Sequence, residues 1–374
     1  MKLKFQNLLW IWLLLLASCQ TAAPISETPS TAELRSTPAT PSPAVEATSA
    51  LPATTAEPPT GFQSDLLRSD IIPVSYIVDA CYYLDSRWDP ANSAPGTVVA
   101  PIMYHSIRPA GEEPVEPSAI NLDTFEATIR TALALGFETI TSSQLSAFLY
   151  ENAQIPRRSM LLILDDRKPG TAEEYFLPVL EENHWTATLA WPIGNTDQRR
   201  SGGRLPGESL WGWIERLNET GYFDIQSHGL NHIYLNDRFL DDAVRQEIEG
   251  SVPILEEHFG QRPIAYIWPG GNYSAFGVKV AREAGFEFGF TVQSHGPILF
   301  NWIPQGNREL EIGDPLMLLP RFWSSAAVIN LEHAAEIGDA ARAFAEQNYP
   351  AEAEWYQANC GGELPPLEAV LDQP

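Results

Sequence analysis

Residues 160–166 read Met-Leu-Leu-Ile-Leu-Asp-Asp, five apolar residues followed directly by two carboxylates. A short, continuous apolar run is typical of a strand buried on both faces of a parallel sheet, so we expect a strand over Met160–Leu164. Asp165 and Asp166 then stand at its carboxyl end, where adjacent side chains point in different directions. One carboxylate can bind a metal while the other acts as a base. An acidic surface turn has the same local pattern.

Similar runs recur on both sides of this strand and alternate with segments of helical spacing, which predicts an α/β domain. The expected strands are Val98–Tyr104, Ala187–Trp191, Phe223–Gln226, Ile264–Trp268 and Phe288–Val292, with a further strand beginning at Thr139. The expected helices are Asp123–Leu135, Ser143–Glu151, Glu173–Asn183, Leu210–Thr220, Asp241–Phe259 and Val278–Ala284, with Ala326–Gln347 in the tail. This order is typical of a parallel barrel or an open doubly wound sheet, and in both the chemistry lies at the carboxyl ends of the strands.

Two histidines follow the strand that ends at Gln226. On a helical turn, His228 and His232 would share a face and could bind one divalent ion. With Asp166 they supply three protein ligands and leave positions for water and substrate, which is the pattern of a catalytic metal site. These ligands suit zinc, and also cobalt, nickel or iron. The metal lowers the pKa of bound water to roughly 7, and Asp165 would take the proton.

Two more polar segments follow expected strands. Trp268, Pro269 and Gly270 begin a glycine-rich turn, and the Gly270 amide could donate to the oxyanion of a tetrahedral intermediate. His105 follows the first strand and is well placed to protonate a leaving amine, although a packed structural histidine is an equal account. His295 is a second candidate for this role.

The N-terminus has the order of an export signal, with two lysines, an apolar run over Leu8–Leu16, and small residues before Cys19. Leu16-Ala17-Ser18-Cys19 resembles the lipobox of bacterial lipoproteins, which implies a signal peptide at 1–18 and a membrane anchor on acylated Cys19. Residues 19–60 are rich in Pro, Thr, Ala and Ser, which predicts a disordered tether. We therefore expect an exported cell-envelope lipoprotein on the extracytoplasmic side. An ordinary secreted protein is the alternative.

The net charge and the absence of certain motifs disfavour several classes of function, and the cysteines leave two possibilities open. A formal net charge of -25 disfavours nucleic acid as a partner. Phosphate-cradling GxxxxGK, GxSxG elbow and Cys-rich zinc motifs are absent from the sequence. Cys81 and Cys360 either pair in an oxidising compartment or stay apart in space.

Together these residues resemble the polysaccharide deacetylases of the NodB-homology group, also classed as carbohydrate esterase family 4. The resemblance spans Val98–Trp323, and Val99–Ile107 resembles the opening motif of the branch that acts on exopolysaccharides such as poly-N-acetylglucosamine. It implies a distorted (β/α)7-type barrel over 98–323, with extensions at 61–97 and 324–374.

The resemblance also implies residue roles. Asp165 would be the base and His105 the general acid. The metal ligands would be Asp166, His228 and His232, and the substrate groove and oxyanion site would include Trp268, Pro269, Gly270 and Arg321, the last in Leu319-Pro320-Arg321-Phe322.

The implied reaction is metal-dependent hydrolysis of N-acetyl groups on N-acetylglucosamine-containing polysaccharide, with release of acetate. The sequence departs from the family pattern at Arg167, where glycine is usual, and at Ile267 and Gly270, where arginine and an aromatic residue are common. A catalytically silent sugar-binding lipoprotein is therefore the main alternative. A phosphoesterase is disfavoured by the acidic charge.

Overall fold

The structure is a computed structural model that describes residues 61–371 apart from 115, 195 and 197–208. The expected signal peptide, Cys19 and the tether at 19–60 lie outside these residues. Among the helices of the described part, none is both long and apolar enough to span a membrane.

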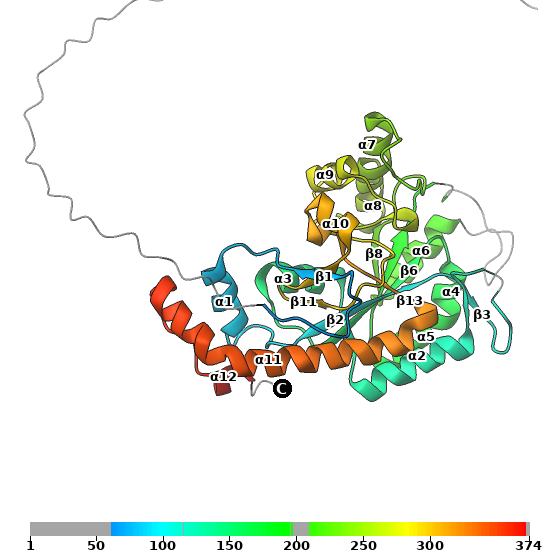
Figure 1. The fold of residues 1–374 in the computed structure, drawn as a ribbon. Helices are drawn as coiled ribbons and strands as arrows, with labels where there is room; N and C mark the ends of the chain where they lie inside the picture. Colours follow the sequence, from blue (N-terminus) through cyan, green and yellow to red (C-terminus); the bar gives the residue numbers. More distant parts are fainter. Residues whose placement is uncertain (1–60, 115, 195, 197–208, 372–374) are drawn as a thin grey trace, which may run out of the picture. The chain divides into compact units, whose positions relative to one another are not determined.

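A curled, mainly parallel sheet forms the centre of the fold (Figure 1). Its strands follow the order β10-β9-β8-β7-β6-β2-β11, and every neighbouring pair is parallel except β2 with β11. The strands are β2 (Val98–Tyr104), β6 (Arg158–Asp165), β7 (Ala187–Trp191), β8 (Phe223–Ser227), β9 (Ala265–Ile267), β10 (Phe288–Phe290) and β11 (Ile298–Leu299). The short strands β5 (Glu138–Thr139) and β13 (Phe322–Trp323) add to β6 and β2. The α/β prediction is confirmed.

A short segment joins the two ends of this sheet. Leu319 bridges Phe290 of β10, and three residues later Phe322 pairs with Ile102 of β2. The sheet therefore curls toward closure, as in a distorted barrel, and is not an open doubly wound sheet. The carboxyl ends of its parallel strands meet at one end of the curl.

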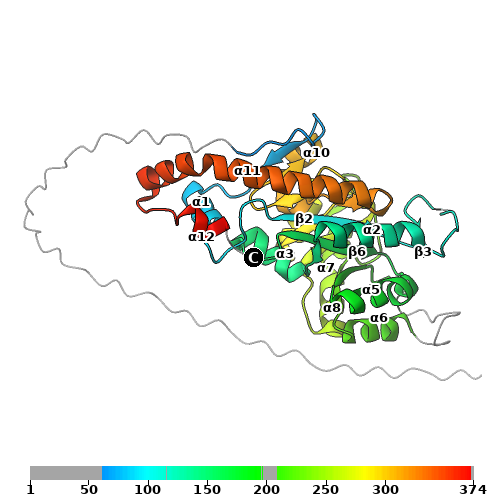
Figure 2. The ribbon, with the colours of Figure 1, turned by 90° about the horizontal axis from the view of Figure 1, so that it is seen from below.

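Helices pack around the sheet (Figures 1 and 2). They include α2 (Leu122–Leu135), α3 (Ser142–Glu151), α6 (Leu210–Glu219), α9 (Ala275–Glu283) and α10 (Asn307–Ile312). The predicted cap of α2 is confirmed, because Gly136 follows it in the left-handed region with φ 74°. Smaller elements are β3 (Ile107–Arg108), β4 (Ile120–Asn121) and the 3-10 turns Pro269–Gly271, Pro315–Leu318 and Ser324–Ala326.

The single helix predicted over Glu173–Asn183 is wrong in its start and its regularity. The chain forms α4 (Pro169–Thr171), a π-helical turn (Ala172–Phe176) and α5 (Leu177–Asn183). Pro178 has no N–H to donate to the carbonyl four residues earlier, and the N–H of Leu177 donates five residues back, to Ala172.

The helix predicted over Asp241–Phe259 is two helices, α7 (Asp241–Glu249) and α8 (Ser251–Phe259). They meet at Gly250. Pro253 lacks the N–H that would bond the Glu249 carbonyl, so the hydrogen-bond ladder is interrupted there.

The N- and C-terminal extensions pack together on the barrel. The strand β1 (Ile72–Val74) pairs antiparallel with β12 (Ile303–Gln305). The helix α1 (Ala80–Trp88) packs against α11 (Ala327–Cys360), which continues well past the predicted end at Gln347, and α12 (Leu367–Leu371) lies beside them (Figure 2). Cys81 and Cys360 form a disulfide with Cα atoms 5.6 Å apart, which resolves the question of their pairing.

Candidate active site

All three expected metal ligands lie together at the carboxyl end of the sheet. Ligand atoms of Asp166, His228 and His232 are all within 4.8 Å of one another. Asp166 Oδ1 lies 3.0 Å from His232 Nε2 and 3.8 Å from His228 Nε2. Two atoms bound to one zinc ion at tetrahedral angles would be roughly 3.4 Å apart. The donor set and its spacing therefore fit a divalent metal.

The two histidines converge through a loop and not through the helical turn that the sequence suggested. Residues 228–236 contain no helix. Gly229 has φ 82° and His232 has φ 60°, so the chain reverses between the two rings. Asp166 is also left-handed, with φ 69°. Strained non-glycine residues cluster at functional sites, and here two of the three ligands are strained.

The tautomer of His228 suits metal binding. Its Nδ1 lies 2.7 Å from the carbonyl oxygen of Ile267 and donates to it, which leaves the lone pair of Nε2 facing Asp166. Burial lowers the pKa of His228 to about 4, against the opposing charge of Asp165. The imidazole is therefore neutral at pH 7, which is the form that binds a metal.

A buried glutamate that the sequence analysis missed holds the histidine loop. Both carboxylate oxygens of Glu247 accept from the N–H of Asn231, and Oε1 also accepts from Ile233. These two residues flank His232. A Cβ at Gly229 would lie 2.3 Å from Glu247 Oε1, so only glycine fits there.

Asp165 is held by Arg321 on the segment that joins the sheet ends. Arg321 Nη1 donates to Asp165 Oδ1 at 2.6 Å, and Arg321 Nε donates to the carbonyl of Thr291. Burial raises the pKa of the Asp165 carboxyl, but the charge of Arg321 opposes this and leaves the pKa below its ordinary value. Asp165 is therefore a carboxylate, and its other oxygen lies 3.9 Å from His228 Nε2.

This geometry corrects the groove prediction for two side chains. Arg321 is fully buried behind Asp165 and does not line a groove. The Trp268 ring is also fully buried, and its Nε1 donates to the carbonyl of Met317. A tryptophan directly after a strand can pack in the core, and sequence alone does not separate it from a sugar-stacking residue.

The turn after Trp268 does reach the surface. Pro269 is buried, whereas Gly270 is exposed and adopts φ 59°. A Cβ at Gly270 would lie 3.1 Å from the ring of Tyr234, and that ring packs edge-on against His232. Tyr234 therefore connects the turn to the metal ligands, which sequence reasoning did not foresee.

His105 is the candidate acid that lies beside the carboxylates. Its pKa is lowered by burial, while the charges of Asp165 and Asp166 act in the opposite direction. Its Nδ1 is buried without a hydrogen-bond partner. His295 lies instead beside α10, with Nε2 3.6 Å from Glu309 Oε1.

The unusual Arg167 does not displace a ligand. Its Nη1 donates to the carbonyl of Pro192, in the loop after β7. The backbone turns tightly here, because the N–H of Lys168 donates to the carbonyl of Asp166. The departure from the family pattern thus leaves all three ligand side chains in place.

The part of the chain that carries these residues is similar to known proteins. The family model for polysaccharide deacetylase matches residues 152–289. A curated protein named "Putative polysaccharide deacetylase YxkH" from Bacillus subtilis (strain 168) is 23% identical over 192 residues, which make up 51% of this chain. The match covers 63% of that relative, so this chain spans less than two thirds of its length.

Two solved structures share the fold. The Streptococcus pyogenes deacetylase PplD, solved in complex with acetate, has a TM-score of 0.52 at 19% identity and covers 65% of this chain and 99% of its own. IcaB from Ammonifex degensii has a TM-score of 0.50 at 16% identity and covers 65% of this chain and 100% of its own. The segment that matches the polysaccharide deacetylase model, 152–289, carries both carboxylates and both histidines, so this part of the chain is similar to that family.

Proposed function

We propose that this protein hydrolyses N-acetyl groups of N-acetylglucosamine-containing polysaccharide in a metal-dependent reaction that releases acetate. The observation that carries the proposal is the placement of an ionised, buried carboxylate, Asp165, beside the convergent ligand atoms of Asp166, His228 and His232. A hydrolase needs a base next to its electrophile, and this arrangement provides it.

Asp166 Oδ1, His228 Nε2 and His232 Nε2 would hold the metal. Zinc fits these ligands, and cobalt, nickel or iron shares the preference. When bound, a divalent ion supplies Lewis acidity that activates water and polarises the acetyl carbonyl.

Asp165 takes the proton from the attacking water. Its Oδ1 is occupied by Arg321, so Oδ2 is the oxygen that faces the ligands and receives the proton. Arg321 thereby fixes the orientation of the base and keeps it ionised.

Two other groups act on the substrate. The amide of exposed Gly270 donates to the oxygen of the acetyl carbonyl as charge develops on it. His105 protonates the departing amine. Because burial lowers the pKa of His105, its protonated form gives up a proton readily.

The same proposal includes the location of the protein in the cell and the type of polysaccharide that it acts on. The lipobox-like residues before Cys19 support a lipoprotein anchored at the extracytoplasmic side of the cell envelope. The motif Val99–Ile107 supports an exopolysaccharide of the poly-N-acetylglucosamine type. A silent sugar-binding protein is not favoured by any feature of the described site, since the ligands and the base are all present.

Acetate release tests the proposal. The full-length chain is stripped with a chelator and incubated with N-acetylglucosamine oligomers, with and without added zinc or cobalt. We expect release only when metal is restored. If zinc-loaded protein releases no acetate from oligomers or from poly-N-acetylglucosamine, the silent alternative replaces the proposal.

A further inference from the structure

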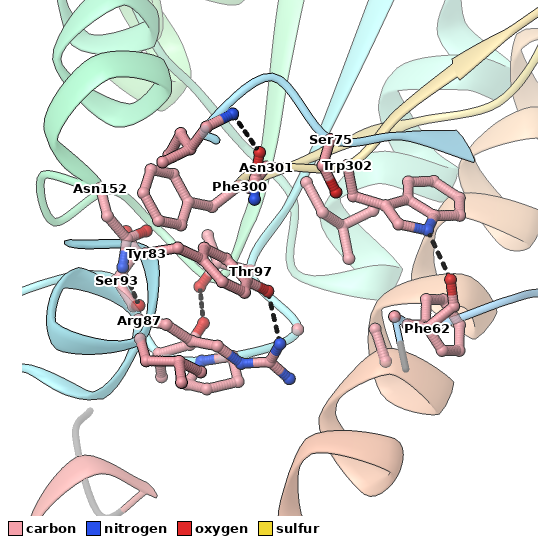
Figure 3. A pocket seen from close by; sticks show the side chains of 18 of the residues that line it. Phe62, Ser75, Tyr83, Arg87, Ser93, Thr97, Asn152, Phe300, Asn301 and Trp302 are labelled. Atoms are coloured by element: carbon pink, nitrogen blue, oxygen red, sulfur yellow. Dashed lines mark hydrogen bonds between the residues drawn. The ribbon is translucent and has the colours of Figure 1, made fainter. Parts of the chain in front are cut away.

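A cavity lies between the N-terminal extension and the C-terminal helix, and the matched deacetylase segment contributes only its first residue, Asn152, to the lining (Figure 3). Its volume is about 270 Å³. It is lined by residues that precede β2, by the turn between β11 and β12, and by α11. The metal ligands follow the opposite, carboxyl ends of the strands. The seven residues of β2 separate the two ends by roughly 23 Å.

Two aromatic pairs form opposite walls of the cavity. Tyr83 and Phe300 stack with ring centroids 5.9 Å apart and an interplanar angle of 29°. Phe62 and Trp302 lie 5.7 Å apart. Figure 3 shows the first pair on one side of the cavity and the second on the other. Such walls suit a flat ring with apolar faces.

Polar groups lie between these walls. Asn301 Oδ1 accepts from the N–H of Tyr76 and Ile77, and Figure 3 shows its amide nitrogen pointing away from that bond. Ser75 and Thr97 add hydroxyl groups to the lining. Hydroxyl and amide groups at the edge of an aromatic slot recognise the hydroxyl groups of a ligand.

The charges of the cavity are balanced. The Arg87 guanidinium donates to the Tyr83 hydroxyl and lies 3.7 Å from Glu352 Oε1. Glu352 also accepts from Trp88 Nε1 at 2.6 Å. Because this cation and this anion neutralise each other, the cavity favours a neutral ligand over a phosphate or a carboxylate.

The walls are fixed by covalent and backbone links. The disulfide from Cys81 ties α1 to the end of α11, and β1 pairs with β12. Asn301, at the tip between the strands, has φ 54°, a left-handed conformation held by the two backbone bonds that it accepts. The cavity is thus preformed, which lowers the entropic cost of binding.

We propose that this cavity binds one neutral sugar residue of the polysaccharide, as a second binding site remote from the metal ligands. Its volume lies just below the roughly 300–1,000 Å³ of pockets for drug-sized ligands, so a single pyranose ring is the size that fits. The ligand class rests on the proposed function. A polymer long enough to reach both ends of the sheet would be retained on the protein between cleavage events.

Blocking variants test this site. Ser75→Trp and Val78→Trp each place an indole on the rim of the cavity, where both residues are exposed. Ile72→Trp is the matched control, since Ile72 is exposed on the same segment but does not line the cavity. Thermal melts establish that each variant folds.

Binding of penta-N-acetylchitopentaose is measured by calorimetry on full-length, chelated protein carrying His228→Ala, so that the metal site contributes little. We expect binding to persist in this background, to weaken at least tenfold with either blocking variant, and to be unchanged by Ile72→Trp. Undetectable binding in the His228→Ala background and in chelated wild-type protein overturns the site. Equal binding by folded blocking variants also overturns it.

A kinetic measurement separates this proposal from the proposed function. Acetate release from di-N-acetylchitobiose, which is too short to reach both sites, should be equal in Ser75→Trp and wild-type protein. On long polymer, Ser75→Trp should raise KM severalfold with kcat unchanged. Sugar binding in the cavity without acetate release would refute the deacetylase activity and leave the binding site standing, whereas equal KM values on long polymer would refute the second site's role in retention.

Discussion

Arg321 Nη1 donates to Asp165 Oδ1 at 2.6 Å, so a residue on the segment that joins the sheet ends holds a carboxylate at the end of β6. The two residues are 156 positions apart in the chain. Both are buried, and Arg321 also bonds the carbonyl of Thr291 after β10. The segment that closes the barrel therefore also holds the base, Asp165, in position.

Removing Arg321 should destabilise the fold as well as the reaction. Arg321→Met leaves the Asp165 carboxylate buried and unpaired, which typically costs about 3–5 kcal/mol of unfolding free energy. Urea denaturation measures this loss. Adding Asp165→Asn to Arg321→Met removes the unpaired charge. This double variant should therefore be more stable than Arg321→Met alone. A double variant no more stable than Arg321→Met would show that the ion pair is not the cause.

Variants of the two adjacent carboxylates should differ in metal content, because Asp165 is the base and Asp166 is a metal ligand. Asp165→Asn should keep metal and lose nearly all turnover, because Arg321 can still hold the amide oxygen while the proton acceptor is gone. Asp166→Ala should lose metal and turnover together, because it removes the oxygen that lies near both histidine nitrogens. Metal content by mass spectrometry and acetate release are measured on the same samples. Near-full turnover by Asp165→Asn would disprove its assignment as the base.

Glu247 should control metal affinity without touching the metal. Glu247→Leu leaves the N–H groups of Asn231 and Ile233 without their acceptor, so the loop that carries His232 loses its fixed shape. Loss of such supporting contacts typically lowers metal affinity about 10–100-fold. Zinc competition titrations measure the change. Gln246→Leu, an exposed neighbour on the same helix, is the control and should bind zinc as the wild type does.

The sequence predicted most strands and the identity of the converging ligands. Runs such as Val98–Tyr104 are buried along their whole length, so their composition reveals them directly. The ligands follow strands that end at the same edge, which brings them together in any parallel arrangement. Helix regularity was less predictable, because Pro178 and Pro253 change hydrogen bonding within otherwise helical patterns.

The supporting residues were harder to predict, for different reasons. Glu247 lies on the buried face of α7 with Val244 and Ile248, so an acidic residue in an apolar stripe was a usable signal. The partner of Arg321 depends on barrel closure, which local patterns do not contain. The burial of Trp268 likewise depends on a distant contact, because its Nε1 donates to the carbonyl of Met317.

The disulfide should stabilise the two extensions and have little effect on the metal site. It joins residues 279 positions apart and ties α1 to the end of α11, where Leu84 and Trp88 pack against Ala345. Cys81→Ala with Cys360→Ala should lower the free energy of unfolding by about 2–5 kcal/mol, in accord with the constraint that a crosslink places on the unfolded chain. Urea denaturation of wild-type protein with a reducing agent should give the same loss, and the double variant should not respond to the reductant. Zinc binding should survive in the folded double variant, because the ligands directly follow β6 and lie in the loop after β8. If zinc binding falls in proportion to stability, the extensions and the metal loop belong to one cooperative unit. The inference that the disulfide does not affect the metal ligands would then be wrong.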